Sequence, residues 1–174
     1  MAKLRPGACY RKPKRPYTRV SRYRELSYVK GVPGSKVRKF DMGSPGKDFD
    51  SKVEVITKES LQIRHNALEA FRMSANSNML KKVGRNNYHF KLKTYPHQII
   101  RHNPTANFAG ADRFSSGMKH SFGKPLGRAA VVKRGQVIGY IRVDEKDVKT
   151  AKKIFKTAVQ RLPCKCSIKI KTPE

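Results

Sequence analysis

Arginine, lysine and tyrosine alternate along the first 24 residues, and side chains of these types in this pattern could bind phosphates and bases. Nine cationic side chains precede the first carboxylate, Glu25. Arginine presents a planar fork that fits phosphate oxygens and stacks on bases, and tyrosine stacks on bases or riboses. A tail that only adds charge has no use for the four regularly spaced tyrosines of residues 1–36, which are Tyr10, Tyr17, Tyr23 and Tyr28. The candidate binding residues in and just after this segment are Arg5, Tyr10, Arg11, Lys12, Lys14, Arg15, Tyr17, Arg19, Arg22, Arg24, Lys36 and Arg38.

A second group of basic candidates lies in and after residues 103–123, where all periodicity is lost. Glycines are frequent there, and glycine lets main-chain amides approach phosphates closely. A nucleotide-binding loop is excluded because no glycine-rich run precedes a Lys-Ser or Lys-Thr pair. A surface loop without a ligand is the alternative, although long irregular loops in compact domains usually have a function. The cations in this group are Arg113, Lys119, Lys124 and Arg128.

The histidines offer a weaker possibility, general acid–base cleavage of RNA. His97 or His102 would have to work with Lys119 or His120. Such groups along RNA are more often simple hydrogen-bond donors, and the only carboxylate nearby in sequence is Asp112. No pair of histidines has metal-ligand spacing. We therefore expect no catalytic residue, no metal and no cofactor.

The three cysteines do not form a disulfide framework. Cys164 and Cys166 are separated by one residue, Cys9 is distant, and no second Cys/His pair with zinc spacing lies near them. We expect reduced structural thiols.

The charge balance identifies the kind of partner. Forty lysines and arginines face twelve aspartates and glutamates, giving a formal net charge of +28 over 174 residues. Such crowding of like charge opposes folding, so a dense polyanion is expected to neutralise it. No apolar run reaches the roughly 20 residues of a membrane span, and the N-terminus is not a secretory signal. We expect a cytosolic nucleic-acid-binding protein. A DNA-compacting architectural protein stays an alternative, but it would need a groove-reading helix or a minor-groove arm.

The elements that must position these residues follow from hydrophobic periodicity. Prolines and glycines break any period in residues 1–36, which we expect to be a basic extension. Residues 37–174 are expected to form one domain that contains the loop 103–123. A helix over 60–82, ended by Gly84, and a helix over 144–162, capped by Asp144, each show an apolar stripe. Alternation predicts strands at 36–42, 49–57, 88–94, 97–102, 126–133, 136–143 and 165–172.

This order of elements indicates the α+β class. We expect a two-layer sandwich, in which a mainly antiparallel sheet has two helices packed on one face. The basic N-terminal extension and a long mobile loop complete the expected architecture.

Short motifs follow one another over nearly the whole chain, in an order and at intervals that are not accidental. They are Arg5-Pro6, Cys9-Tyr10-Arg11, Pro16-Tyr17, Val32-Pro33-Gly34-Ser35-Lys36-Val37, Phe40-Asp41-Met42-Gly43, Ala67-Leu68-Glu69-Ala70, Ala109-Gly110-Ala111-Asp112-Arg113, Ser116-Gly117-Met118, Phe122-Gly123-Lys124-Pro125-Leu126-Gly127 and Gly135-Gln136-Val137-Ile138. In these motifs the chain resembles the family of large-subunit ribosomal proteins called ten-e in archaea and eukaryotes, which corresponds to bacterial large-subunit protein sixteen. Lys119-His120-Ser121 departs from the Arg-Gly-Ala of eukaryotic relatives. The chain ends soon after its last expected strand, as archaeal members do.

The resemblance implies a structural constituent of the large ribosomal subunit that joins late in assembly. Members pack into large-subunit RNA between the central protuberance and the base of the acidic stalk, near the tRNA path. The implied partners are large-subunit (23S-type) ribosomal RNA, with 5S ribosomal RNA as a further candidate, tRNA and neighbouring ribosomal proteins. No membrane and no small-molecule substrate are implied. The family's long loop, here residues 103–117, points towards the peptidyl transferase centre, which adds Asn103, Gly110, Asp112 and Gly117 to the candidates.

Arg113→Ala should leave folding intact and impair tRNA accommodation or subunit maturation, because it removes the cation from the loop that the resemblance directs towards tRNA. Growth rate and polysome profiles of cells that carry only this variant measure the effect. Wild-type growth with wild-type profiles would refute the assignment.

Overall fold

The computed structural model describes residues 5–13, 15–18, 23–27, 29, 31–104 and 122–171, without the side chain of Arg24. It contains two α-helices, eight strands and four short 3-10 helices within these ranges. In chain order the elements are η1 Gly7–Tyr10, η2 Arg24–Leu26, β1 Asp41–Gly43, β2 Ser51–Thr57, β3 Leu61–Arg64, α1 His65–Lys82, η3 Arg85–Asn87, β4 Tyr88–Leu92, β5 Gln98–His102, β6 Lys124–Val132, β7 Val137–Val143, η5 Glu145–Asp147, α2 Val148–Val159 and β8 Cys166–Lys171.

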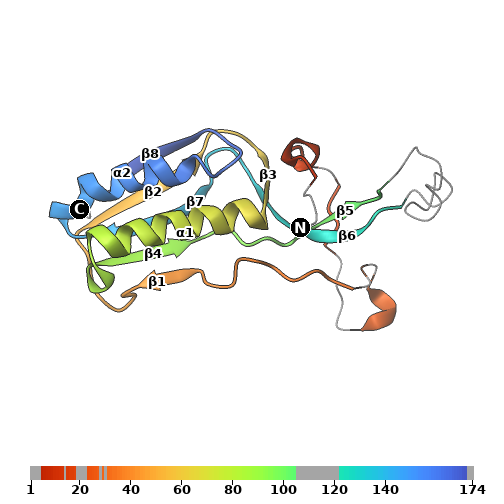
Figure 1. Cartoon of the computed structure of the whole chain (residues 1–174), viewed down its shortest axis with the longest axis horizontal. Coiled ribbons are helices and arrows are strands. Elements are labelled where there is room, and N and C mark those ends of the chain that lie inside the picture. The colour runs from red at the N-terminus through yellow and green to blue at the C-terminus, as the bar shows by residue number, and fades with distance from the viewer. Residues whose placement is uncertain are drawn as a thin grey trace.

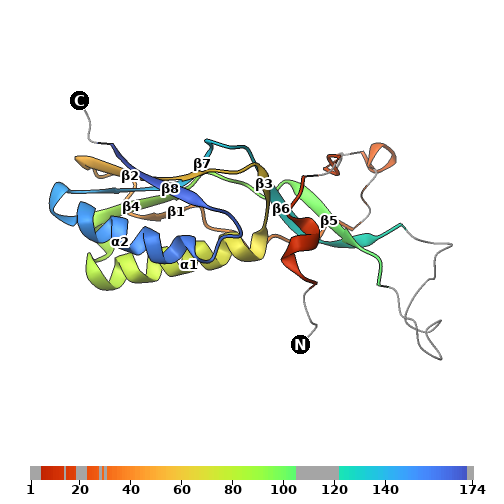
Figure 2. The same ribbon diagram turned by 90° about the horizontal axis from the view of Figure 1, so that it is seen from above.

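The strands form two antiparallel sheets, and both α-helices cover one face of the larger sheet (Figure 1). The large sheet has the order β1-β4-β7-β2-β8, and the small sheet has the order β3-β6-β5. Figure 2 shows the helices side by side beneath the large sheet, with the small sheet at the other end of the molecule. The expected α+β class, with a mainly antiparallel sheet and two helices on one face, is confirmed.

The division into two sheets depends on a strand that the periodicity did not predict. Residues 61–64 were expected to begin the first helix, but they form β3 and pair with β6. Leu61 and Ile63 are both buried, as alternation in a strand requires, and Arg64 still has extended backbone angles. Pairing with β6 therefore overrides the helical spacing, and α1 begins at His65. At the other end, Gly84 has the expected positive φ, +89°.

Two further local expectations were wrong. Of the strand expected at 36–42, only the last two residues are in a strand, β1. At the start of this stretch, the backbone amide of Lys36 donates to the Nδ1 atom of His65 rather than to a neighbouring strand. Asp144 does not cap the second helix with its side chain. Its carboxylate lies 3.6 Å from Lys47 Nζ, and its carbonyl oxygen accepts the amide of Asp147 in η5, so α2 begins only at Val148.

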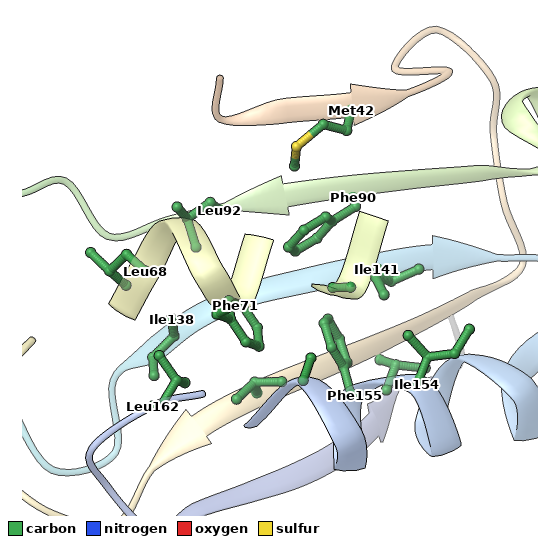
Figure 3. Packing of buried hydrophobic residues seen from close by; sticks show 14 of the residues in the cluster. Met42, Leu68, Phe71, Phe90, Leu92, Ile138, Ile141, Ile154, Phe155 and Leu162 are labelled. Carbon is green, nitrogen blue, oxygen red and sulfur yellow. The ribbon is translucent and has the colours of Figure 1, made fainter. Parts of the chain in front are cut away.

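Three phenylalanine rings join the two helices to the sheet at the centre of the core (Figure 3). Phe71 of α1 stacks on Phe155 of α2 with ring centroids 5.8 Å apart, and Phe90 of β4 meets both rings edge to face at 5.9–6.0 Å. All three are fully buried. The buried residues of α2 are Ala151, Ile154, Phe155 and Ala158. None of the described helices is both long and apolar enough to cross a membrane.

Phe155→Ala should lower the free energy of unfolding by about 3–5 kcal/mol, because it leaves a cavity between two aromatic neighbours that are themselves held in place. Urea unfolding followed by circular dichroism measures the change. Lys152→Ala, on the exposed side of the same helix, is the control and should stay within about 0.5 kcal/mol of the wild type. An unchanged melting temperature for Phe155→Ala would contradict the packing of α2.

Candidate nucleic-acid interface

The basic N-terminal segment is attached to both outer strands of the small sheet. The carbonyl oxygen of Arg11 accepts the Gln62 amide of β3 at 2.8 Å, and the carbonyl oxygen of Tyr17 accepts the Ile99 amide of β5 at 3.0 Å. Tyr10 is buried, and its hydroxyl donates to the carbonyl oxygen of Arg101 at 3.1 Å. The described part of the extension thus docks on the protein through its backbone. Its cationic side chains stay exposed to solvent.

A cavity of about 470 Å³ opens where this segment meets the small sheet, and we call it the arm pocket. It gathers five of the predicted binding residues of the extension, together with Asn103 from the start of the loop. No carboxylate occurs among the described residues that line it. These residues are Arg5, Cys9, Tyr10, Lys12, Arg15, Tyr17, Gln62, Gln98, Ile99, Ile100, Arg101, Asn103, Phe122 and Gly123.

Arg101 and Phe122 are pocket residues that the sequence did not identify as binding residues. The Arg101 guanidinium carbon lies 4.2 Å from the ring centroid of Tyr17 and 4.3 Å from that of Phe122. The two rings meet edge to face at 6.3 Å. Only the fold brings together residues from the extension, β5 and the segment before β6, so spacing along the chain could not have revealed this cluster.

The other predicted binding residues do not gather in the pocket. Arg11, Lys36, Arg38 and Lys124 are exposed and do not line it. The Arg128 guanidinium is used within the fold, where its Nε donates to the Pro33 carbonyl oxygen at 2.7 Å and so links β6 to the segment around Pro33. The remaining predictions lie outside the described residues, namely Lys14, Arg19, Arg22, the side chain of Arg24, Gly110, Asp112, Arg113, Gly117 and Lys119.

A second cationic surface, which the sequence analysis did not single out, covers the face of the large sheet away from the helices. We call it the basic sheet face, and its cations surround Tyr140 of β7. The Tyr140 ring is buried, with Lys52 Nζ at 4.5 Å, Arg142 at 5.4 Å and Lys93 Nζ at 5.7 Å from its centroid. The alternation of lysine with apolar residues in β4 and β8 is the sequence signal for it. The cations of this face are Lys52, Lys91, Lys93, Arg142, Lys169 and Lys171.

The register of the large sheet places like charges directly opposite each other on this face. Lys171, Lys52 and Arg142 follow one another across β8, β2 and β7, and His89 continues the row on β4. Like charges in direct cross-strand pairs are destabilising. The two carboxylates of this face, Glu54 and Asp41, leave most of the positive charge uncompensated. The surface therefore fits a polyanion.

Glu54 is the main internal counter-charge of the basic sheet face. Its side chain is 3 % exposed, and its carboxylate oxygens lie 2.6 Å from Lys52 Nζ and 3.4 Å from Lys171 Nζ. Burial alone would raise the pKa of Glu54, but the hydrogen bond and charge of Lys52, with the charge of Lys171, outweigh burial and hold the pKa below its ordinary value. A carboxylate with a lowered pKa stabilises the fold at neutral pH, and this stabilisation is lost as the pH falls through the folded-state pKa.

Two of the described histidines have defined polar partners within the fold. Burial, followed by the charges of Lys36, Arg128 and Arg64, lowers the pKa of His65, whose Nδ1 accepts a backbone amide. His89 Nε2 lies 3.1 Å from Asp41 Oδ1. Within the described ranges, no group of three His, Cys, Asp or Glu residues could hold a metal ion.

Glu54→Gln should lower the free energy of unfolding by about 1–3 kcal/mol at neutral pH and low salt, because two neighbouring cations, Lys52 and Lys171, lose their counter-charge. Urea unfolding at several pH values measures the effect. The gap between wild type and variant should close as the pH falls and the wild-type carboxylate is protonated. Glu145→Gln, at an exposed position before α2, is the control. A gap that stays constant down to the acid transition would contradict the role of the ion pairs.

Comparison with known proteins gives one consistent family. The family model described as Ribosomal protein L16p/L10e matches residues 13–169. Large ribosomal subunit protein uL16 of Metallosphaera sedula is 47 % identical over 163 residues, which cover 92 % of this chain and 90 % of that protein. The uL16 proteins of Staphylothermus marinus and Archaeoglobus fulgidus are 43 % identical over 169 residues and 42 % identical over 159 residues. These matches cover 97 % and 91 % of this chain and 94 % and 88 % of those proteins, respectively. The chain therefore belongs to the ribosomal protein L16p/L10e family, in the archaeal form that its motifs predicted.

Proposed function

We propose that the chain is a structural constituent of the large ribosomal subunit that binds ribosomal RNA with two surfaces, the arm pocket and the basic sheet face. The family is a structural component of the ribosome, so the chain is not an enzyme. The relatives are named as proteins of the large subunit, which supports the same assembly and a cytoplasmic ribosome as the location. The observation that carries the proposal is cation clustering with few carboxylates on both surfaces.

The two surfaces suit the backbone of a folded RNA. Arginine and lysine side chains at the arm pocket project from a segment whose main chain is fixed to β3 and β5, so phosphates can be bound without first ordering that segment. Within the row of Lys171, Lys52 and Arg142, neighbouring cations lie on adjacent strands, which are roughly 4.8 Å apart. A polyanion laid across them would relieve the repulsion between strands.

The motif resemblance suggests where in the large subunit the protein binds. We propose 23S-type RNA near the tRNA path as the binding partner, with 5S ribosomal RNA as a further candidate. Residues 103–117 are directed towards the peptidyl transferase centre, where they support tRNA positioning. The protein enters the subunit late in assembly.

Binding to a large-subunit RNA fragment across a range of salt concentrations tests this function. Lys12→Ala with Arg15→Ala should reduce the slope of log K against log salt by about 1.4–1.8, since each phosphate contact contributes about 0.7–0.9. Lys93→Ala with Arg142→Ala, on the basic sheet face, should reduce the slope by the same amount. The two reductions should add when all four substitutions are combined. Lys152→Ala with Lys156→Ala, on the exposed side of α2, is the matched charge control and should leave the slope unchanged.

Two outcomes would count against the proposal. Equal affinity for random duplex DNA and for the ribosomal fragment would favour a general architectural protein. Absence of the endogenous protein from washed large subunits would refute a place in the ribosome.

A further inference from the structure

We propose that the arm pocket captures the base of one unpaired nucleotide, in addition to binding the phosphate backbone. This inference rests on the proposed function and names what the pocket recognises. In paired RNA the bases are stacked inside the helix, so the ligand is a nucleotide from a bulge or a loop.

The first argument is an exposed aromatic ring that nothing on the described surface covers. The Phe122 side chain is 70 % exposed, although it stands at the mouth of a basic pocket. Arg101 holds the ring from one side, and Tyr17 meets it edge to face. The ring is thus fixed in place but still accessible. Aromatic rings presented in this way bind bases by stacking.

The second argument is the charge around that ring. Arg5, Lys12, Arg15 and Arg101 line the pocket, and its described lining contains no carboxylate. Stacking alone would suit many apolar ligands, but four cations select a ligand that carries phosphate. The volume of about 470 Å³ lies within the range of small-ligand sites. A base with its flanking phosphates meets both conditions.

The third argument is an unpaired polar atom in the wall of the pocket. The Gln62 side chain is only 7 % exposed, and its Oε1 has no hydrogen-bond partner among the described residues. A buried acceptor without a donor costs free energy. Gln98 lines the same pocket, and its Nε2 donates to the Arg15 carbonyl oxygen at a long 3.4 Å. Carboxamides of this kind form hydrogen bonds with the edges of bases. The amino group of adenine, cytosine or guanine could donate to Gln62 Oε1 after a small shift of the residues that bury this atom.

Two RNA hairpins that differ in one base provide the test, with the full-length chain as the protein. One hairpin carries a single bulged adenosine, and the other has an abasic residue at the same position, so both have the same phosphates. The wild type should bind the adenosine hairpin about tenfold more tightly, the order expected from stacking of one base. The slope of affinity with salt should be the same for both hairpins.

Variants of the pocket distinguish the contribution of the base to affinity from that of the phosphate backbone. Phe122→Ala should bind both hairpins equally, with the affinity of the wild type for the abasic one, whereas Phe122→Tyr should keep the preference. Arg101→Lys keeps the charge and should lose most of the preference while retaining the salt slope. Leu80→Ala removes an exposed apolar side chain from α1 and should change nothing. Thermal melting checks that each variant is folded. We expect Phe122→Ala to fold normally because the Phe122 ring is largely exposed.

The possible failures are distinguishable. If the wild type binds both hairpins equally with a steep salt dependence, the pocket holds backbone only, and this inference is overturned while the proposed function stands. If Phe122→Ala keeps the tenfold preference, the base is bound elsewhere and the inference also fails. If neither hairpin nor the large-subunit fragment is bound at any salt concentration, the proposed function itself fails.

Discussion

Repulsion between cations on the large sheet is the constraint that shapes this molecule. Lys171, Lys52 and Arg142 stand next to one another across three strands, with only Glu54 buried among them as a close counter-charge. The opposite face of the same strands offsets this cost, since it packs two helices around the rings of Phe71 and Phe155. One face of the sheet thus stabilises the fold. The other face keeps uncompensated positive charge, which suits the polyanion that we propose as its ligand.

The small sheet anchors the described part of the basic N-terminal segment through hydrogen bonds. The fixed groups are main-chain atoms of Arg11 and Tyr17 and the buried hydroxyl of Tyr10. The charged ends of the neighbouring side chains remain in solvent. The predicted binding residues are therefore held near one another by main-chain contacts and the Tyr10 hydroxyl. Arg128 is the exception, because its guanidinium ties the Pro33 segment to β6.

Periodicity predicted most of the fold because the core faces of both helices and of most strands are regular. It failed at Leu61, where a seven-residue spacing to Leu68 fits a helix, but pairing with β6 decides the outcome. The capping preference of aspartate failed at Asp144, whose carboxylate pairs with Lys47 rather than with helix amides. In the candidate site, the cations of the extension were visible in the sequence. The cluster of Arg101 and Phe122 was not, since it depends on which segments meet in space.

The docking of the N-terminal segment has one more consequence. Outer strands of a sheet expose unpaired amides and carbonyls, and these recruit strands from other molecules into aggregates. Here the amides of Gln62 and Ile99, one on each outer strand of the small sheet, are already occupied by carbonyl oxygens of the same chain. The segment that we propose to contact RNA therefore also limits edge-to-edge self-association of the small sheet.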